Sequence, residues 1–366
     1  MATIVIASGG TGGHLYPTIA IAEAIRESYP EIRIVFIGTP DRIEAREVPR
    51  SGFEFFPIEI KAPGRSIGKL LSFSMQYYRA LRRSKKILEE VGASAFLGGG
   101  AYLSVPVAFA AKRKRIPIAL LEINAVIGRA NRIIAKDASK IFVNYLEAIK
   151  QFRGVKPSKI EVIGTPVRDG LRKHISATDG QKHFGLDPGR KTLLVFGGSL
   201  GARSLNEAMQ QSVQKFLDEG LNIIWQTGPS LSSEAVREIF PDHTRIYIRE
   251  FISEMPEAYA ASDLVVCRAG ASTLAELSTL GKAAILVPYP LAVKDHQTKN
   301  AETFRDRGAA RIITDRELPM KFEAEVLSLL RDSEALEQLR TAMHAKENLT
   351  ARTVVADYLV KQAMAQ

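Results

Sequence analysis

Short apolar runs alternate with longer amphipathic segments along the whole chain. The runs are rich in β-branched residues and lack polar alternation, which is typical of strands buried on both faces. In the first half we expect strands at residues 3–7, 32–37, 53–60, 95–97, 118–121, 140–143 and 160–163. In the second half we expect them at 192–196, 221–226, 245–248, 264–266, 284–287 and 310–313. Such strands separated by helices predict an α/β fold with parallel sheets covered on both faces.

Each half opens on a strand that runs directly into a glycine-rich turn. The first turn reads Ser8-Gly-Gly-Thr-Gly-Gly-His14, and the second reads Gly197-Gly-Ser-Leu-Gly-Ala-Arg203. Glycine backbone can approach a ligand closely, and the N–H groups of the following helix favour an anion. A tight turn selected only for packing is the alternative. Two such units predict two Rossmann-like domains, with a linker near the start of residues 166–189.

Candidate functional residues occur at the first glycine turn and at a third turn, which follows the strand expected at residues 264–266. Pro17 is expected in the first turn of the helix after the first loop, and His14 there is a candidate general base. The third turn, Cys267 to Glu276, allows two interpretations. One is a capping box formed by a hydroxyl residue and Glu276. The other is a nucleotide site in which Thr273 meets a diphosphate and Glu276 accepts from a ribose diol.

Composition narrows the class of protein. The 366 residues fit two domains, and the net charge of +10 predicts an anionic partner. The single cysteine, Cys267, excludes an internal disulfide and agrees with a reducing cytoplasm. No apolar run approaches the ~20 residues of a membrane span. The N-terminal run has no basic leader, so we expect no signal peptide.

Residues 61–88 contain no acidic residue but many basic ones interleaved with apolar ones. The segment is either an amphipathic helix with a solvated basic face or an interfacial segment on anionic lipid headgroups. A second basic cluster follows at residues 112–115. Nucleic-acid binding would also explain the charge, but no RNA- or DNA-binding motif accompanies it. We therefore expect an anionic membrane surface, and no nucleic acid, as a partner.

No metal-ligand cluster and no Asp-x-Asp motif occur in the sequence. A diphosphate leaving group would then be neutralised by helix dipoles, loop N–H groups and an arginine. Arg168 and Arg268 are candidates for this role, and either could equally be a salt-bridge partner. Because glycine turns end strands at the carboxyl edge of a sheet, two such edges facing each other would suit transfer of a group from a phosphate-activated donor.

Six short motifs occur in one order along nearly the whole chain, from about residue 3 to 360. They are Gly9-Gly-Thr-Gly-Gly-His14, Glu122-Ile-Asn124, Gly164-Thr-Pro-Val-Arg168, Gly197-Gly-Ser-Leu-Gly-Ala-Arg203, Cys267-Arg-Ala-Gly-Ala-Ser-Thr-Leu-Ala-Glu276 and Asp295-His-Gln297. In this order they resemble the MurG family of bacterial peptidoglycan glycosyltransferases, family 28. The chain departs from the usual family pattern at Ala101, Val105, Leu121 and Ile123, all in the acceptor half.

The resemblance implies a GT-B fold, with two Rossmann-like domains whose parallel sheets face each other across a cleft. Residues 1–165 would be the acceptor and membrane-associating domain, with a C-terminal helix at about 345–366 packing back on it. Residues 166–344 would bind UDP-GlcNAc. The implied reaction is inverting transfer of GlcNAc to the C4 hydroxyl of undecaprenyl-diphosphate-linked muramyl-pentapeptide. No cofactor is implied, and the enzyme would be peripheral on the cytoplasmic face of the inner membrane.

The resemblance also implies site residues. His14 is the first choice for the general base and Glu122 the second. Substrate contacts are implied at Thr11, Gly12, Gly13, Tyr102, Asn124, Asn131, Arg168, Ser199, Asn206, Ile252, Arg268, Ala271, Ser272, Thr273, Leu274, Ala275, Glu276 and Gln297. Another GT-B enzyme of UDP-sugars, such as a UDP-GlcNAc epimerase or a different glycosyltransferase, remains the alternative. A nicotinamide oxidoreductase fits poorly, because the G-x-G-x-x-G spacing is missing.

Overall fold

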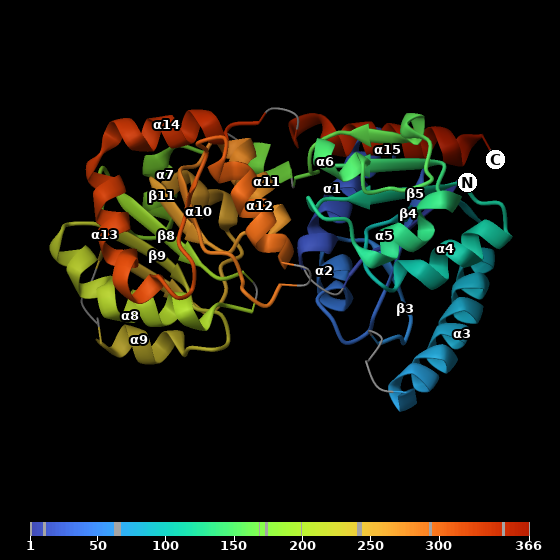
Figure 1. Ribbon diagram of the computed structural model, residues 1–366, viewed down its shortest axis with the longest axis horizontal. Coiled ribbons are helices and arrows are strands. Elements are labelled where there is room, and N and C mark those ends of the chain that lie inside the picture. The colour runs from blue at the N-terminus through green and yellow to red at the C-terminus, as the bar shows by residue number, and fades with distance from the viewer. Residues whose placement is uncertain are drawn as a thin grey trace. The chain divides into compact units, whose positions relative to one another are not determined.

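The computed structural model describes residues 2–9, 12–61, 67–167, 169–172, 175–198, 200–239, 244–292, 295–345 and 348–365. The chain divides into two compact units (Figure 1). Unit 1 comprises Met1–Asp169 and Glu347–Gln366, and unit 2 comprises Gly170–Lys346. Each unit contains one sheet in which every strand pairing is parallel, with helices around it. The predicted α/β class with parallel sheets is confirmed.

The sheet of unit 1 has the strand order β3-β2-β1-β4-β5-β6-β7. Its strands are β1 (Thr3–Ala7), β2 (Arg33–Gly38), β3 (Glu54–Pro57), β4 (Ala93–Gly98), β5 (Ile118–Glu122), β6 (Lys140–Val143) and β7 (Ile160–Val162). The order reverses direction between β1 and β4. In open parallel sheets the carboxyl ends of the strands at this point form the usual ligand site. The first glycine loop follows β1 and therefore lies at this point.

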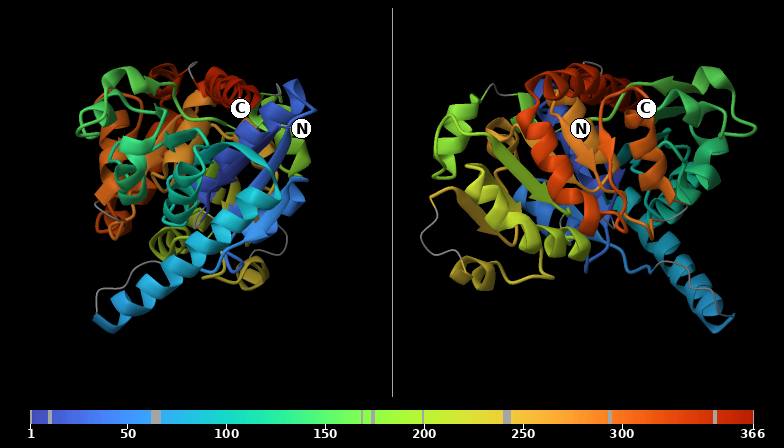
Figure 2. Two further views of the ribbon diagram at one scale, coloured as in Figure 1. Left: turned by 90° about the vertical axis from the view of Figure 1, so that its right-hand side faces the viewer. Right: turned by 60° about the vertical axis from the view of Figure 1, so that its left-hand side comes forward.

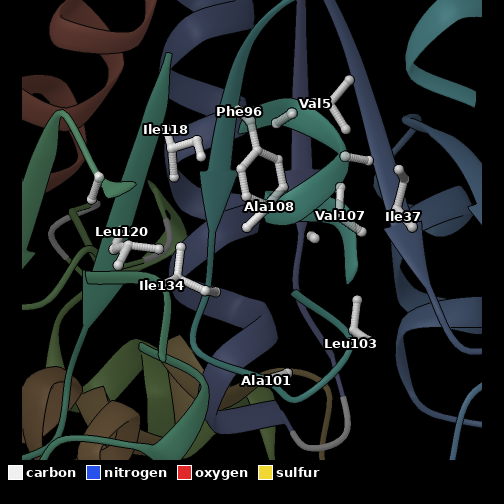
Figure 3. Close-up of a cluster of buried hydrophobic side chains, with 14 of the residues drawn as sticks. Val5, Ile37, Phe96, Ala101, Leu103, Val107, Ala108, Ile118, Leu120 and Ile134 are labelled. Atoms are coloured by element: carbon white, nitrogen blue, oxygen red, sulfur yellow. The ribbon is translucent and has the colours of Figure 1, made fainter. Parts of the chain in front are cut away.

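The helices of unit 1 are α1 (Gly12–Ser28), α2 (Glu44–Arg50), α3 (Ile67–Glu90), α4 (Ser104–Arg113), α5 (Arg129–Ile134), α6 (Leu146–Ile149) and α15 (Asn348–Met364). Apolar side chains of the sheet and of α4 form one buried cluster, in which Phe96 and Val107 are completely buried (Figure 3). The C-terminal helix α15 packs on α1 and β4. An ion pair of 2.9 Å from Arg352 to Glu27 of α1 anchors it, and the Arg352 side chain is only 3% exposed.

The sheet of unit 2 has the strand order β10-β9-β8-β11-β12-β13, so its direction reverses between β8 and β11. Its strands are β8 (Thr192–Phe196), β9 (Asn222–Gln226), β10 (Ile246–Arg249), β11 (Leu264–Cys267), β12 (Ala284–Leu286) and β13 (Arg311–Ile312). Its helices are α7 (Ala177–His183), α8 (Arg203–Asp218), α9 (Ser233–Ile239), α10 (Met255–Ala261), α11 (Ala271–Leu280), α12 (His296–Arg305), α13 (Leu318–Arg331) and α14 (Ser333–Met343). The glycine turn after β8 and the small-residue turn after β11 flank the reversal.

One local prediction in unit 1 is wrong. Pro17 does not lie in the first turn of α1, because this helix begins at Gly12 and takes up the end of the glycine loop. Two side-chain hydroxyls bind carbonyls in the first turn of this helix. Ser8 Oγ donates to the His14 carbonyl at 2.7 Å, and Thr18 Oγ1 donates to the Leu15 carbonyl at 2.7 Å.

Among the described residues, no helix is both long enough and apolar enough to cross a membrane. The longest helix, α3, carries basic residues along its length. Its N-terminal half projects beyond the sheet of its own unit (Figure 2). This helix covers most of the basic and apolar segment singled out from the sequence.

Candidate functional site

In unit 1, three elements bring His14, Gly100 and Asn131 together at the carboxyl edge of the sheet. His14 lies in the first turn of α1, Gly100 follows β4, and Asn131 lies in α5. A β-carbon at Gly100 would be 3.2 Å from Nδ1 of His14 and 3.3 Å from Nδ2 of Asn131. Gly100 also has a φ of +91°, a backbone conformation that residues other than glycine rarely adopt. A glycine therefore allows the imidazole and the amide to pack against the turn after β4.

Glu122, at the end of β5, lies beside this group and is 1% exposed. Its Oε1 accepts from the backbone N–H of Asn124 at 3.1 Å and from the side-chain amide of Asn124 at 3.2 Å. Its Oε2 accepts from the backbone N–H of Gly128 at 2.7 Å and from Nδ2 of Asn131 at 3.1 Å. Four donors therefore hold this carboxylate, and the carboxylate in turn fixes the loop between β5 and α5.

A second buried carboxylate lies against the first glycine loop, and the sequence analysis did not single it out. Glu44, at the start of α2, is completely buried and accepts from the backbone N–H of Thr39 at 3.0 Å and from its hydroxyl at 2.7 Å. A β-carbon at Gly9 would collide with both carboxylate oxygens of Glu44. The glycine at position 9 thus lets the loop approach this internal anion.

The remaining predicted positions of unit 1 are less enclosed. Gly12, Gly13 and Asn124 are partly exposed. The Tyr102 hydroxyl donates to the Ile60 carbonyl at 3.2 Å, and burial raises the pKa of Tyr102. Thr11 and Arg168, together with Ser199 in unit 2, lie outside the described residues.

In unit 2, the glycine turns after β8 and β9 pack backbone to backbone. Gly201 and Gly228 both have positive φ, at +70° and +67°. A β-carbon on either would lie 2.4 Å from backbone atoms of the other turn. Gln226 links the same region: its Nε2 donates to the Gly198 carbonyl at 2.9 Å, and its Oε1 accepts from the Ile252 N–H at 2.9 Å. The Ile252 position thus depends on a glutamine that the sequence analysis missed.

Asn206, in α8, binds β9 and the loop after it through both ends of its side-chain amide. It is 4% exposed, and its Nδ2 donates to the Thr227 carbonyl at 2.8 Å and to Ser230 Oγ at 3.3 Å. Its Oδ1 accepts from Nε1 of the completely buried Trp225 at 3.1 Å. These internal partners give Asn206 a positioning role for the loop after β9.

The third turn is not a capping box. Helix α11 begins at Ala271 with Gly270 as its N-cap, and no side chain caps it. Thr273 is therefore inside the helix, and Glu276 accepts instead from the Tyr259 hydroxyl at 2.8 Å. Because the helix dipole places partial positive charge at the N-terminus of α11, the turn from Ala271 to Thr273 is suited to an anion. Of the predicted positions further along, Leu274 and Ala275 are buried.

Of the two roles considered for Arg268, the structure shows an ion pair. Its guanidinium pairs with Asp315 at 2.5 Å and also donates to Ser204 Oγ at 3.0 Å. Gln297, in the first turn of α12, accepts from the Tyr289 N–H at 2.9 Å. Cys267 is completely buried, and this burial raises the pKa of its thiol far above the usual range. A buried thiol of this kind is a poor nucleophile.

No group of three or more histidine, cysteine, aspartate or glutamate side chains in the described part of the chain could hold a metal ion. The polar groups at both sheet edges are instead amides, hydroxyls, carboxylates and helix N-termini. This set can bind hydroxyl groups and phosphates through hydrogen bonds.

Family models match both units. The glycosyltransferase family 28 N-terminal domain matches residues 4–143, and the C-terminal domain of the same family matches residues 192–354. The chain belongs to glycosyltransferase family 28. Both domains of the family are therefore matched in this chain, and the predicted family is confirmed.

Relatives and solved structures agree with this assignment. The UDP-N-acetylglucosamine--N-acetylmuramyl-(pentapeptide) pyrophosphoryl-undecaprenol N-acetylglucosamine transferase of Thermodesulfovibrio yellowstonii is 38% identical over 93% of each chain. The protein of the same name from Parabacteroides distasonis is 34% identical over 98% of this chain and 97% of its own length. The crystal structure of Acinetobacter baumannii MurG superposes with a TM-score of 0.74, at 27% identity over 98% of this chain and 99% of that one.

Replacement of Asn206 by leucine should destabilise this family 28 chain. The substitution leaves the Trp225 N–H and the Thr227 carbonyl buried without their partner, at a cost of about 2–4 kcal/mol. Trp225 is the only tryptophan, so its fluorescence during urea denaturation reports on unit 2. Gln210→Leu, at an exposed position of the same helix, is the control and should change stability by no more than about 0.5 kcal/mol. Equal midpoints for the two variants would contradict the positioning role.

Proposed function

We propose that this chain transfers GlcNAc from UDP-GlcNAc to the C4 hydroxyl of undecaprenyl-diphosphate-linked muramyl-pentapeptide, with inversion at the anomeric carbon. The observation that carries the proposal is similarity over 93–98% of this chain, at 34–38% identity, to proteins named as N-acetylglucosamine transferases of UDP-N-acetylglucosamine and N-acetylmuramyl-(pentapeptide) pyrophosphoryl-undecaprenol. The carboxyl-edge groups of both units support it, because they suit a nucleotide and a hydroxylic acceptor. Transfer would complete the lipid-linked disaccharide used in peptidoglycan synthesis.

Unit 2 would bind the donor. Glu276, 8% exposed and in the second turn of α11, would accept hydrogen bonds from the ribose hydroxyls. The helix N-terminus from Ala271 to Thr273 would meet the diphosphate and stabilise the charge that develops as UDP leaves. With Arg268 already paired to Asp315, this helix N-terminus is the better candidate for that charge.

Unit 1 would bind the acceptor, with His14 as the general base. The imidazole would take the proton of the C4 hydroxyl as its oxygen attacks the anomeric carbon opposite the leaving UDP. Glu122 is the weaker candidate, because four internal donors already bind its carboxylate. Its proposed role is to position the loop of Asn124 and the amide of Asn131, beside His14.

The reaction itself is tested by incubating the chain with UDP-GlcNAc and the lipid-diphosphate acceptor and measuring UDP release. Release should require both substrates, because the acceptor oxygen is the nucleophile. UDP release or epimerisation of the sugar without acceptor would instead support another class of UDP-sugar enzyme.

Replacement of His14 by alanine should lower kcat by about 10²–10⁴-fold, the contribution typical of a general base. The Kd for UDP should stay within about twofold, because His14 lies in unit 1 and the proposed donor groups lie in unit 2. Turnover by steady-state kinetics and UDP affinity by calorimetry measure the two effects. His344→Ala, at an exposed histidine, is the control. Unchanged turnover in the His14 variant would remove this residue from the role.

We also propose that α3 attaches the enzyme peripherally to the cytoplasmic face of the inner membrane. One side of α3 is buried and includes Ile87 and Leu88. The other side exposes Met75 by 60% and Tyr78 by 59%. The Arg82 guanidinium lies 5.8 Å from the Tyr78 ring centroid, so cationic and apolar groups share this exposed side. Anionic headgroups and the interfacial region of a bilayer match that combination.

Changing Arg82, Arg83, Lys85 and Lys86 to glutamate should weaken binding to phosphatidylglycerol vesicles by at least about tenfold at ~0.1 M salt, because each cation contributes about 1 kcal/mol near an anionic surface. Vesicle co-sedimentation measures this binding. A variant with the same charge change at exposed positions of unit 2, Arg305, Arg307, Arg316 and Lys321, is the control. Equal loss in both variants would show that net charge, and not α3, governs binding.

A further inference from the structure

One buried hydrogen bond in unit 2 involves a residue to which neither the motifs nor the proposed mechanism gives a role. Tyr259 lies in α10, is completely buried, and donates its hydroxyl proton to Oε2 of Glu276 at 2.8 Å. Its ring also packs edge to face against Phe196 at the end of β8, with 6.1 Å between the centroids. The ring is therefore fixed by packing, and its hydroxyl is aimed at a carboxylate on the next helix.

This bond restricts the carboxylate in a specific way. A free glutamate side chain loses up to about 2 kcal/mol of rotamer entropy when it is ordered. A phenol that donates to one carboxylate oxygen removes part of this freedom before any ligand arrives, and such charge-assisted bonds are among the stronger ones in proteins. The two oxygens of Glu276 are then no longer equivalent, because Tyr259 binds Oε2.

We propose that Tyr259 is the positioning residue that sets the ribose selectivity of the nucleotide site, by holding Glu276 in the orientation that accepts from the ribose diol. The inference rests on the proposed function, since it assigns a partner to the carboxylate of the UDP site. A fixed carboxylate increases the binding affinity for a nucleotide with both ribose hydroxyls, and it increases the affinity for a 2′-deoxynucleotide by less. Tyr259 therefore acts on the discrimination between the two sugars and does not itself contact the nucleotide.

The test is the variant Tyr259→Phe in the full-length chain, with UDP and 2′-deoxy-UDP titrated by calorimetry. We expect the Kd for UDP to rise about tenfold, the size of one orientation-dependent hydrogen bond. The Kd for 2′-deoxy-UDP should rise by less than about threefold, so the ratio of the two constants falls. Tyr247→Phe, at a partly exposed tyrosine of the same unit, is the control and should change neither constant.

A double-mutant cycle with Glu276→Ala distinguishes positioning from a general packing effect. If Tyr259 acts through Glu276, Tyr259→Phe has no further effect on UDP affinity once Glu276 is alanine. Additive effects, or a Tyr259→Phe variant that keeps the wild-type selectivity ratio, would overturn the inference. Glu276→Gln provides a second route if Tyr259→Phe does not fold, because it weakens the acceptor while keeping the side chain. It should reduce the selectivity ratio, and an unchanged ratio would count against the inference.

Different binding results would contradict the proposed function and the role of Tyr259. An unaltered chain that binds neither nucleotide would contradict the UDP site itself. An unaltered chain that binds UDP and loses affinity on Glu276→Ala, but shows no change on Tyr259→Phe, would contradict the role of Tyr259 alone.

Discussion

The close approach of one backbone to another at the ends of parallel strands is the constraint on which the rest of the structure depends. In unit 2, the turns after β8 and β9 lie so near each other that a β-carbon at Gly201 or Gly228 would reach 2.4 Å from the opposite backbone. In unit 1, a β-carbon at Gly100 would lie only 3.2 Å from Nδ1 of His14, so a glycine at this position lets the imidazole pack closely on the turn after β4. Glycine at these points lets helix N-termini and functional side chains converge at one edge of each sheet.

Buried polar side chains then hold the edges in place. Glu122 binds the loop after β5, Asn206 binds the loop after β9, and Gln226 binds the turns after β8 and β10. Each of these groups is buried, and an amide or carboxylate without such bonds would cost about 1–3 kcal/mol. The same bonds that satisfy these groups therefore fix the backbone that a substrate would contact. At each of the two sheet edges, positioning and stability therefore depend on the same interactions.

Residues that match family motifs consequently differ in what they do. Asn206 directs its amide inward to Trp225 and Thr227, and Arg268 pairs with Asp315. Glu276 accepts at Oε2 from the Tyr259 hydroxyl and is the residue proposed to bind the ribose hydroxyls. A motif shows that a residue belongs to the site region, but its contacts show whether it supports the site or faces the ligand.

The sequence by itself determined the fold class, most strand positions, the glycine turns and the family, because continuous apolar runs and short motifs are local properties of the chain. Two local patterns led to wrong predictions: the spacing of Thr273 and Glu276 suggested a capping box, and Pro17 suggested that the helix begins later than Gly12. Only the tertiary structure decided that Tyr259 meets Glu276 and that Glu44 lies against Gly9. These contacts join residues from different elements, and their partners depend on strand order and helix packing, which no local pattern contains.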